Sequence, residues 1–469
     1  MADERFEEHL RRPFARGHVP VGARAGAAGG AACGDLVTLA VALDGPLVAD
    51  VGFDASGCGA TIAAGSAAAA LTRGRPLLDA ARIGVAEIAG ELGGLSPGKL
   101  HAAELAADAL HRALGAAVAA SAPPEPVGGR TLVAMSGGVD SAVAALLCAR
   151  EGDVAAVTLE LWRDPENDGE RSCCSASAVR TARALAHRMG LAHFTLDLRE
   201  EFRAGVVQPW LDDHAAGLTP NPCVRCNGHV RLDAMLAFAE RAGARQLATG
   251  HYARTDPRSG LLRLAADPAK DQTYMLAALA PAAIARMRFP LGELTKPQVR
   301  ALAAEHGLPV ARKPDSQDLC FLAGTGRAAF LARHGGLRER PGAIVDGGGH
   351  VLGRHRGAHS FTVGQRRGLG IGGAGEPLYV VATDARANTV TVGPREALAT
   401  RTVRVRGLRL HVTEHEVEAV RLRYRSPALA CSLKGEQVAL EEPFEGAAPG
   451  QSAVFLAGDR IVGCGTIAA

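Results

Sequence analysis

The sequence has no long run of apolar residues and little net charge. No stretch approaches the roughly 18 consecutive apolar residues of a membrane span, so we expect no transmembrane helix. Glycine and proline number 57 and 25 among 469 residues, which is below the share of roughly 25–30% that marks low-complexity chains. The opening stretch ADERFEEHLRR lacks the apolar segment of a secretory signal. We therefore expect a soluble globular protein of the cytoplasm.

Lysine is scarce, and the basic residues are almost all arginines. The formal net charge is only +3, which does not by itself indicate nucleic-acid binding. Arginines number 47, and base-composition drift explains them most simply, although a guanidinium pairs well with phosphate. The lysines are Lys99, Lys270, Lys296, Lys313 and Lys434. The ten cysteines of a cytoplasmic protein are expected to be thiols, ligands or catalysts rather than disulfides.

The chain divides at a linker into two unlike parts. At roughly 150 residues per domain its length predicts about three domains. Residues 116–129 (AAVAASAPPEPVGG) combine small residues with prolines that cannot continue a helix. Upstream, residues 36–43 and 47–56 read as a strand pair. Helical patterns follow at 60–73, 77–92 and 101–115. Residues 1–115 are therefore expected to form a small α+β module.

Downstream of the linker, strands alternate with helices. Residues 131–135 (TLVAM) read as a buried strand that runs into the turn SGGVDS and a helix over 139–151. Further strands are expected at 154–162, 193–198 and 246–254, with a helix at 177–189. This alternation predicts a doubly wound parallel sheet over 130–325. Later runs such as LYVVATD, TVTVG and TVRVRGL predict one or two small β domains, and no internal repeat is evident.

The string SGGVDS (136–141) is a candidate polyphosphate site. Between a strand and a helix, the backbone N–H groups of a glycine turn converge on one point, which suits phosphate. Ser136, Asp140 and Ser141 could bind phosphate or its magnesium ion. No GxxxxGKS/T string occurs, which excludes a loop of the kind that cleaves γ-phosphate. The string resembles the pyrophosphatase-loop family of ATP enzymes, which adenylate a carbonyl oxygen.

Three cysteines of the second part lie in polar or irregular segments. TPNPCVRCN (219–227) places Cys223 and Cys226 in a loop that contains Pro220 and Pro222. Such a CxxC pair suits half a zinc site, a redox pair or part of an iron–sulfur site, and no second pair completes a four-sulfur zinc cage. Cys320 lies in KPDSQDLCFL, among polar and acidic residues. The spacing alone leaves their chemistry open.

A series of strings over residues 136–455 resembles the tRNA-specific 2-thiouridylases. These strings are, in order, SGGVDS, CCSA, GLTPNPCVRCN, TGHYAR, KDQTYML, KPDSQDLCF, HSFTVGQRRGLGI, RYRSP and PGQSAVF. The resemblance implies a pyrophosphatase-loop domain at 130–325, a central small domain at 326–396 and a C-terminal β-barrel at 397–469 that helps to hold tRNA. The arginine clusters RHRGAH (354–359) and RLRYR (421–425) could neutralise its phosphates.

The resemblance implies ATP-dependent 2-thiolation of the wobble uridine of tRNA. Cys320 would carry a persulfide from a cysteine desulfurase or sulfur-relay protein, and Cys226 would attack or resolve it. The ATP site, with Mg²⁺, would comprise Ala134, Met135, Ser136, Gly137, Gly138, Val139, Asp140, Ser141, Leu159 and Gly250. The base pocket and tRNA contacts would comprise Asn221, Pro222, Cys223, His251, Lys270, Asp271, Gln272, Arg423, Tyr424 and Gln451.

Many relatives carry aspartate at the position of Cys223. The additional thiol in this chain leaves a second route for sulfur transfer open. Cys223, Cys226 and Cys320 could together bind three irons of a four-iron, four-sulfur cluster whose last iron holds a sulfide. We prefer the persulfide route. The remaining cysteines of this part carry no assigned chemistry: Cys148, Cys431 and Cys464 are expected in the core, and Cys173 and Cys174 have no assigned role.

The first module carries cysteines in glycine-rich turns at strand ends. With HLRRP and SPGKLHAAELAADALHRAL, the strings ACGDL and SGCGATIAAGS resemble the NifU/IscU-type iron–sulfur scaffolds. The resemblance places Cys33, Asp35, Cys58 and His101 at the metal or cluster site. That family has a further cysteine directly after the histidine, where this chain has Ala102. A residual metal or cluster site, a docking platform for a sulfur donor or for the thiolase, and a purely structural role therefore stay open.

We therefore expect a fusion of a scaffold-like module with a tRNA thiolase. A short flexible linker would raise the local concentration of the donor to about the millimolar range. One rival is a related enzyme that thiolates another tRNA base. The other is a non-enzymatic iron–sulfur carrier with a vestigial ATPase half, against which the intact SGGVDS, Cys226 and Cys320 argue. The tRNAs that are modified, the sulfur donor and the oligomeric state stay open.

Overall fold

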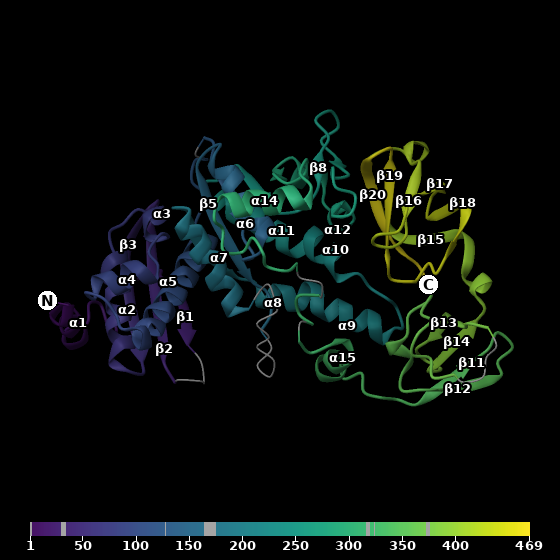
Figure 1. Cartoon of the computed structure of the whole chain (residues 1–469), viewed down its shortest axis with the longest axis horizontal. Coiled ribbons are helices and arrows are strands. Elements are labelled where there is room, and N and C mark those ends of the chain that lie inside the picture. Colours follow the sequence, from purple (N-terminus) through teal and green to yellow (C-terminus); the bar gives the residue numbers. More distant parts are fainter. Residues whose placement is uncertain are drawn as a thin grey trace. The chain divides into compact units, whose positions relative to one another are not determined.

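The computed structural model folds into two compact units (Figure 1). It describes residues 2–29, 34–126, 128–163, 175–315, 319–322, 324–371 and 376–469. The first unit comprises Met1–Arg199, Ala234–His251 and Arg286–Cys320, and the second comprises Glu200–Asp233, Tyr252–Ala285 and Phe321–Ala469. Among the described residues, none of the helices has the length and apolar character needed to cross a membrane.

The first unit begins with an antiparallel sheet, in the order β1-β2-β3, and its helices. The predicted strand pair is confirmed: β2 and β3 pair from Leu36 opposite Ser56. On β2, Val37, Leu39 and Val41 alternate into the core, as expected for a sheet with one buried face. The elements are α1 (Ala2–Arg11), β1 (Arg24–Gly29), β2 (Leu36–Asp44), β3 (Leu47–Ser56), α2 (Gly59–Thr72), α3 (Leu77–Ala80), α4 (Val85–Glu91), η1 (Pro97–Lys99) and α5 (Leu100–Ala120).

Helix α5 extends beyond its predicted end at residue 115. The alanine-rich run 116–120, which the sequence placed in the linker, is helical because alanine is the strongest helix former. Ala117 and Val118 are buried, so this last turn also belongs to the core. The helix stops at Ser121, shortly before Pro123 and Pro124. The irregular connection therefore starts only after Ala120.

The second part of the first unit is the expected parallel sheet between helices. Its strand order is β10-β7-β4-β5-β6, and every neighbouring pair is parallel. Strand β5 is buried along its whole length, which is typical of a parallel sheet covered on both faces. Its elements are β4 (Thr131–Ala134), α6 (Val139–Ala149), β5 (Val154–Glu160), α7 (Ala176–Arg188), β6 (Ala192–Asp197), α11 (Leu232–Arg241), β7 (Gln246–Thr249), β10 (Met287–Arg288) and α14 (Lys296–Glu305).

Within the first unit, α5 packs against strand β6 and helix α7. The Asp108 carboxylate accepts hydrogen bonds from Arg183 at 2.7 Å and Arg180 at 2.9 Å. Arg112 donates to Glu160 at 2.9 Å. A side chain at Gly115 would lie 2.0 Å from the Thr195 carbonyl oxygen, so helix and strand are in close contact. The module is therefore held by side chains as well as by the linker, which differs from the flexible tether expected from the sequence.

The second unit holds the β domains that the sequence predicted. A four-stranded sheet, in the order β12-β11-β14-β13, forms one of them. A second sheet runs β15-β18-β17-β16-β19-β20 and closes into a barrel because β15 also pairs with β20. Val405, Val438 and Phe455 are among the fully buried residues of the barrel core. The predicted fold class, including the central small domain and the C-terminal barrel, is confirmed.

The elements of the second unit are many and short. The helical segments are α8 (Arg199–Phe202), η2 (Arg203–Val207), α9 (Gln208–Ala215), α10 (Pro222–Cys226), η3 (Asn227–Arg231), α12 (Thr273–Leu276), α13 (Pro281–Ile284), α15 (Arg327–Gly335), η4 (Ala358–Ser360), η5 (Arg395–Leu398) and η6 (Glu414–Glu416). The strands are β8 (Arg254–Thr255), β9 (Leu262–Arg263), β11 (Gly342–Val345), β12 (Val351–His355), β13 (Tyr379–Asp384), β14 (Thr389–Gly393), β15 (Ala399–Leu410), β16 (Ala419–Arg421), β17 (Leu429–Lys434), β18 (Gln437–Glu445), β19 (Ser452–Ala457) and β20 (Arg460–Ile467).

Candidate functional site

The glycine turn after β4 has the strand–turn–helix form that the sequence predicted. Strand β4 ends at Ala134, and Gly138 is the N-cap of α6. The Ser141 hydroxyl accepts from the Ser136 backbone N–H at 3.1 Å and donates to the Gly138 carbonyl at 3.1 Å. Side chains of the turn therefore fix its shape, and the N-terminus of a helix, here α6, is a favourable place to bind an anion.

Two glycines allow the close packing around this turn. Gly137 has a φ of +70°, and a Cβ there would lie 2.8 Å from the Ala178 carbonyl oxygen. A Cβ at Gly250 would lie 2.8 Å from the Ser141 backbone nitrogen. Of the other residues predicted for the ATP site, Met135, Val139 and Leu159 are buried. Gly250 is thus close to the turn, as its predicted role in the ATP site requires.

Two lysines that the sequence analysis did not assign to the site contact this turn. The Lys296 ammonium lies 2.7 and 2.8 Å from the two oxygens of Asp140 and 2.8 Å from Asp315. Lys313 donates to the Gly137 carbonyl at 3.0 Å. Scarcity of lysine was the signal that could have found them, because a chain that uses arginine almost everywhere retains lysine at both positions.

The three candidate reactive cysteines lie in two units. Cys320 is half-buried in the first unit, after residues 316–318, which are outside the described chain. Cys223 and Cys226 lie on α10 in the second unit, where Cys223 is half-buried and Cys226 is buried. The Asn221 side chain caps this short helix by accepting from the Cys223 backbone N–H at 3.1 Å.

The remaining cysteines mostly agree with the core role that the sequence predicts. Cys148 and Cys431 are buried, and Cys464 is partly buried on β20. Burial raises the pKa of each of these three thiols to about 11, so they are poor nucleophiles near neutral pH. Cys33, Cys173 and Cys174 lie outside the described residues.

Several residues predicted to contact tRNA are held by bonds within their own part of the chain. Asp271 accepts from the Ala265 N–H at 2.8 Å. Gln272 accepts from the Tyr252 N–H at 3.0 Å, and Gln451 donates to the Thr219 carbonyl at 2.7 Å. In the first unit, His251 lies 2.9 Å from the Thr249 hydroxyl. Their predicted contacts with tRNA stay predictions.

The string RYRSP forms an arginine–aromatic surface on the second unit. Arg423 is exposed, with its guanidinium 5.8 Å from the centre of the Phe444 ring. Arg425, the last residue of the cluster RLRYR, lies 5.3 Å from the Tyr424 ring and has a φ of +63°. Tyr424 in turn lies 5.9 Å from the Tyr274 ring. Arginines stacked on aromatic rings suit both phosphates and unstacked bases.

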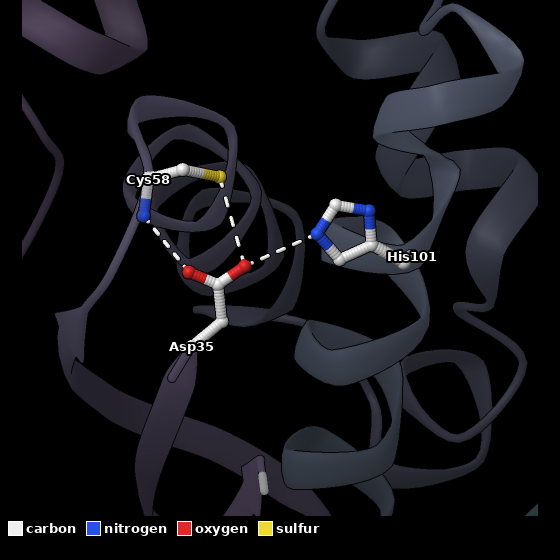
Figure 2. Close-up of side chains that lie close together, drawn as sticks. All are labelled: Asp35, Cys58 and His101. Atoms are coloured by element: carbon white, nitrogen blue, oxygen red, sulfur yellow. Dashed lines mark hydrogen bonds and ion pairs between the residues drawn. The ribbon is translucent and has the colours of Figure 1, made fainter. Parts of the chain in front are cut away.

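In the N-terminal module, Asp35, Cys58 and His101 come together from three elements (Figure 2). Asp35 directly precedes β2, Cys58 is the N-cap of α2, and His101 lies in the first turn of α5. One Asp35 oxygen lies 3.1 Å from the His101 Nε2 and accepts a bond from the Cys58 Sγ at 3.7 Å. The other accepts from the Cys58 backbone N–H at 2.9 Å. The structure therefore brings together the described members of the predicted ligand set.

This cluster has the donor chemistry of a metal site. One sulfur, one oxygen and one nitrogen atom lie within 4.8 Å of one another, a set that suits zinc or iron. The hydrogen bond from the Cys58 N–H holds the pKa of Asp35 below its usual value, against the opposing effect of burial. A Cβ at Gly57 would lie 1.9 Å from the Asp35 carboxylate, so this turn requires glycine. The fourth predicted ligand, Cys33, is outside the described residues.

Comparison with known families covers nearly the whole chain. Residues 3–120 match the NifU-like N terminal domain, and residues 129–324 match the tRNA methyl transferase HUP domain. Residues 328–394 match the tRNA methyl transferase PRC-barrel domain, and residues 400–467 match the Aminomethyltransferase beta-barrel domain. These matches follow one another along the chain in the order of the folded parts.

Curated relatives match at high identity. The chain is 46% identical to the bifunctional protein NifU/MnmA of Rubrobacter xylanophilus, over 99% of this chain and 98% of that protein. It is 44% identical to the tRNA-specific 2-thiouridylase MnmA of Rhizorhabdus wittichii, over 74% of this chain and 94% of that protein. The tRNA-specific 2-thiouridylase MnmA of Thermus thermophilus is 43% identical, over 71% of this chain and 93% of that protein. The chain therefore belongs to the tRNA-specific 2-thiouridylase family and, over its full length, to the bifunctional NifU/MnmA proteins.

Proposed function

We propose that this chain is a sulfurtransferase that uses ATP to replace the C2 oxygen of the wobble uridine of tRNA by sulfur. The observation that carries the proposal is the closed SGGVDS turn at the N-terminus of α6, in a chain 46% identical to a NifU/MnmA protein over 99% of its length. A decayed ATPase half would have no reason to keep this geometry.

In the first step, the turn holds ATP. Backbone N–H groups of residues 136–139 and the start of α6 bind the phosphates, and Asp140 is the candidate ligand for the accompanying Mg²⁺. The C2 oxygen of uridine attacks the α-phosphorus, and pyrophosphate leaves. The uridine is now adenylated, so its former C2 oxygen can depart as part of AMP.

In the second step, sulfur arrives from a persulfide on Cys320. The terminal sulfur attacks C2 of the adenylated uridine, and AMP leaves with the original oxygen. The Cys226 thiolate then attacks the Sγ of Cys320 and breaks the S–S bond. The products are 2-thiouridine and a Cys226–Cys320 disulfide, which a thiol reductant reduces. A cysteine desulfurase, directly or through a relay protein, supplies the next persulfide sulfur.

The base must leave its stack before either step, because C2 is inaccessible within a stacked anticodon loop. We assign the pocket for the base to Asn221, Pro222 and Cys223. The further contacts are assigned to His251, Lys270, Asp271, Gln272, Arg423, Tyr424 and Gln451. The exposed Arg423 beside Phe444 supports the part of this proposal that concerns phosphate.

Nucleoside analysis of tRNA transcripts tests the proposal. The full chain is incubated with tRNA, ATP, Mg²⁺, cysteine and a cysteine desulfurase, and the digested nucleosides are identified by mass spectrometry. We expect 2-thiouridine at the wobble position only when ATP is present. Cys320→Ser and Cys226→Ser should abolish it, whereas the control Cys464→Ala, which lies on barrel strand β20, should retain it. Product in the Cys320 variant would contradict the persulfide route.

Cys223 distinguishes the persulfide route from the iron–sulfur route. The cluster needs the Cys223 thiolate as an iron ligand, whereas the persulfide route uses only Cys226 and Cys320. We therefore expect Cys223→Ala to keep thiolating tRNA in air, with weaker binding of tRNA because Cys223 is also assigned to the base pocket. Loss of activity in this variant, together with loss of bound iron from the anaerobically purified chain, would favour the cluster instead.

For the N-terminal module, we propose a metal or cluster site formed by Asp35, Cys58 and His101, with Cys33 as the further ligand. A bound iron or zinc ion there would fix the module's turns, and an iron–sulfur unit would add a source of iron and sulfide. Ala102, at the place of the family's further cysteine, predicts weaker binding than in a complete scaffold. The alternative is a docking role, which the contacts of α5 with β6 and α7 support.

Metal content of the anaerobically purified full chain tests this second proposal. We expect bound iron or zinc after reconstitution, with a clear loss in Cys58→Ala and in His101→Ala. Cys464→Ala serves as the matched control, because it removes a thiol from the barrel and should keep the metal. Equal metal content in all four proteins would contradict the assignment and leave docking as the module's role.

A further inference from the structure

We propose that one helical run, formed by α8, η2 and α9, supports both reactive thiols, and that Phe321 is the positioning residue that attaches Cys320 to it. The run is continuous from Arg199 to Ala215. The inference rests on the proposed function, because it takes Cys320 and Cys226 as the thiols that exchange sulfur. The contacts that carry it join residues of the second unit, to which the chain returns at Phe321.

Phe321 is the buried residue of an irregular segment. Helix α14 ends at Glu305 and α15 begins at Arg327, and the described residues between them form no helix or strand. Among the described residues of 311–329, only Phe321 is buried, with 3% of its surface exposed. Cys320, directly before it, is half-buried. A segment without regular structure is held by the few side chains that it buries, so the Phe321 ring is the buried anchor next to Cys320.

The Phe321 ring lies among aromatic rings from three helices. Its centre is 5.9 Å from the Phe202 ring on α8 and 5.3 Å from the Trp210 ring on α9. The third ring, Phe330 on α15, is 5.2 Å away, and α15 lies beside α9 (Figure 1). The ring planes are inclined to that of Phe321 by 58° to 78°, close to the favoured edge-to-face arrangement. Because all three partners are buried in a close-packed interior, the Phe321 ring cannot shift without displacing them.

This anchor restricts Cys320 because the two residues share a peptide bond. Consecutive Cα atoms are about 3.8 Å apart. A fixed Phe321 therefore confines the Cys320 backbone, and only the Cys320 side chain keeps its rotamer freedom. The proposed chemistry needs this restriction, because the terminal sulfur of the persulfide must reach C2 of uridine and its Sγ must then meet the Cys226 thiolate.

The same helical run holds the segment that carries Cys226. Arg225, directly before Cys226 on α10, donates to the Gly205 carbonyl of η2 at 2.6 Å. A Cβ at Gly205 would lie 2.6 Å from the Val230 side chain, so η3 also packs closely on η2. Gly205 lies between the two aromatic residues of the run. Each cysteine is thus attached to this run through the residue directly beside it.

A common support limits the relative motion of the two thiols. After sulfur transfer, the Cys226 thiolate must break the S–S bond of Cys320 before a thiol from solution does so. Two groups held in this way react at an effective concentration well above that of free thiols. The aromatic anchor therefore serves the exchange step without touching the tRNA or the nucleotide.

The equilibrium of the Cys226–Cys320 disulfide with glutathione tests the proposal. The full chain is equilibrated at set ratios of reduced to oxidised glutathione. The two thiols reduce one molecule of oxidised glutathione to two molecules of reduced glutathione, and the disulfide is quantified by mass spectrometry of alkylated peptides. We expect Phe321→Ala to lower the effective concentration of the two thiols by about tenfold. Phe321→Leu, which keeps part of the apolar volume but not the ring contacts, should lower it several-fold.

Variants at other positions separate positioning from stability. Arg225→Gln removes the bond to η2 and should also lower the effective concentration several-fold. The control Phe194→Leu removes another buried ring, 5.5 Å from that of Phe238 in the first unit, and should keep the wild-type value even if it unfolds at a lower temperature. The control Arg401→Gln removes the bond of an exposed arginine to the Glu441 carbonyl and should keep the wild-type value too. In the thiolation assay, kcat of the Phe321 variants should fall while KM for ATP and for tRNA stays unchanged.

Circular dichroism at the assay temperature shows which variants are folded, and Phe321→Leu decides the outcome if Phe321→Ala is not. A wild-type effective concentration in Phe321→Leu or in Arg225→Gln would overturn the common support. An equal decrease in Phe194→Leu would also overturn it, because general loss of stability would then explain the effect. A wild-type chain that forms no Cys226–Cys320 disulfide would instead contradict the exchange step of the proposed function, which is a different result.

Discussion

Several charged side chains of this chain are buried and paired with an opposite charge. Asp108 on α5 is 5% exposed and pairs with Arg183 on α7, whose side chain is 4% exposed. Lys296 has the same character beside the nucleotide turn. A charged side chain buried in this way needs its oppositely charged partner. Water no longer solvates it, and the partner alone offsets the free-energy cost of desolvation.

Replacement of Asp108 by Asn should destabilise the first unit by about 3–5 kcal/mol, because it leaves the buried Arg183 without its carboxylate. The expected readout is faster amide hydrogen exchange in α5. The matched control is Asp79→Asn, which breaks the exposed pair of Asp79 with Arg82 and should cost no more than about 1 kcal/mol. Equal exchange in the two variants would contradict the assigned role of Asp108.

At the residue scale, sequence motifs provided candidate site residues but not the partners of those residues. SGGVDS identified Ser136, Asp140 and Ser141 because the glycine turn is local in sequence. Lys296 is far from Asp140 along the chain, and no local pattern relates them. Arg183, within an amphipathic helix, likewise carries no sign of its pairing with Asp108. Such pairs arise only when distant elements pack.

At the scale of elements, strongly periodic segments were predicted and small-residue segments were not. Strands β2, β3 and β5 are rich in valine and leucine and match their predictions closely. Strand β1, RAGAAG, was missed because it has no β-branched or aromatic residue. Small residues are needed in β1 because α5 packs closely against this strand. A Cβ at Gly26 would lie 2.3 Å from the Ala113 backbone nitrogen on α5. The helix predicted at 77–92 is two helices, α3 and α4, separated at Gly84.

Gly26→Ala should therefore separate β1 from α5 and destabilise the module by about 1–3 kcal/mol, the usual cost of overpacking. Thermal unfolding of the full chain measures the effect. Gly90→Ala on α4 is the matched control, because a Cβ there meets nothing within 4 Å and alanine favours a helix. Unfolding of Gly26→Ala at the wild-type temperature would contradict the close packing of β1 on α5.

A cluster of three histidines joins α5, α7 and β6. The rings of His111 and His187 are 5.2 Å apart, and those of His111 and His193 are 5.4 Å apart. Burial, with help from the nearby charge of Arg183, lowers the pKa of His111 and His193 well below the usual 6.5. Burial also lowers the pKa of His187, whose other charged neighbours are Glu87 and Arg82. The folded state therefore holds these rings neutral.

Stability of the first unit should fall as the pH drops below the usual histidine pKa. The unfolded chain takes up protons near pH 6.5, whereas the folded chain resists them until lower pH, so acid favours unfolding. Urea midpoints measured from about pH 7.5 to about pH 5.5 should decrease, and less steeply in His187→Gln. His350→Gln, at an exposed histidine, is the matched control for the loss of one imidazole from the chain. A pH-independent midpoint would contradict the buried neutral state.

At the scale of the whole molecule, the order of the domains along the chain was predictable because each domain contains its own sequence motifs. The parallel sheet and the presence of small β domains follow from alternation and turn residues that are local in sequence, whereas the central domain and the barrel were implied by the resemblance to the 2-thiouridylases. The packing of α5 on β6 was not predictable, because it depends on Gly115 and on a carbonyl of a distant strand. The expected flexible tether was inferred from the proline-rich linker alone, without this contact.

Transfer of heavy oxygen to AMP reports directly whether uridine is adenylated at its C2 oxygen. A tRNA labelled with heavy oxygen at C2 of the wobble uridine is mixed with the full chain loaded with persulfide, ATP and Mg²⁺ for a single turnover. We expect one labelled AMP for every 2-thiouridine formed, because the C2 oxygen leaves on the α-phosphate. Thiolated uridine formed with unlabelled AMP would contradict adenylation at C2, and with it the proposed role of the SGGVDS turn.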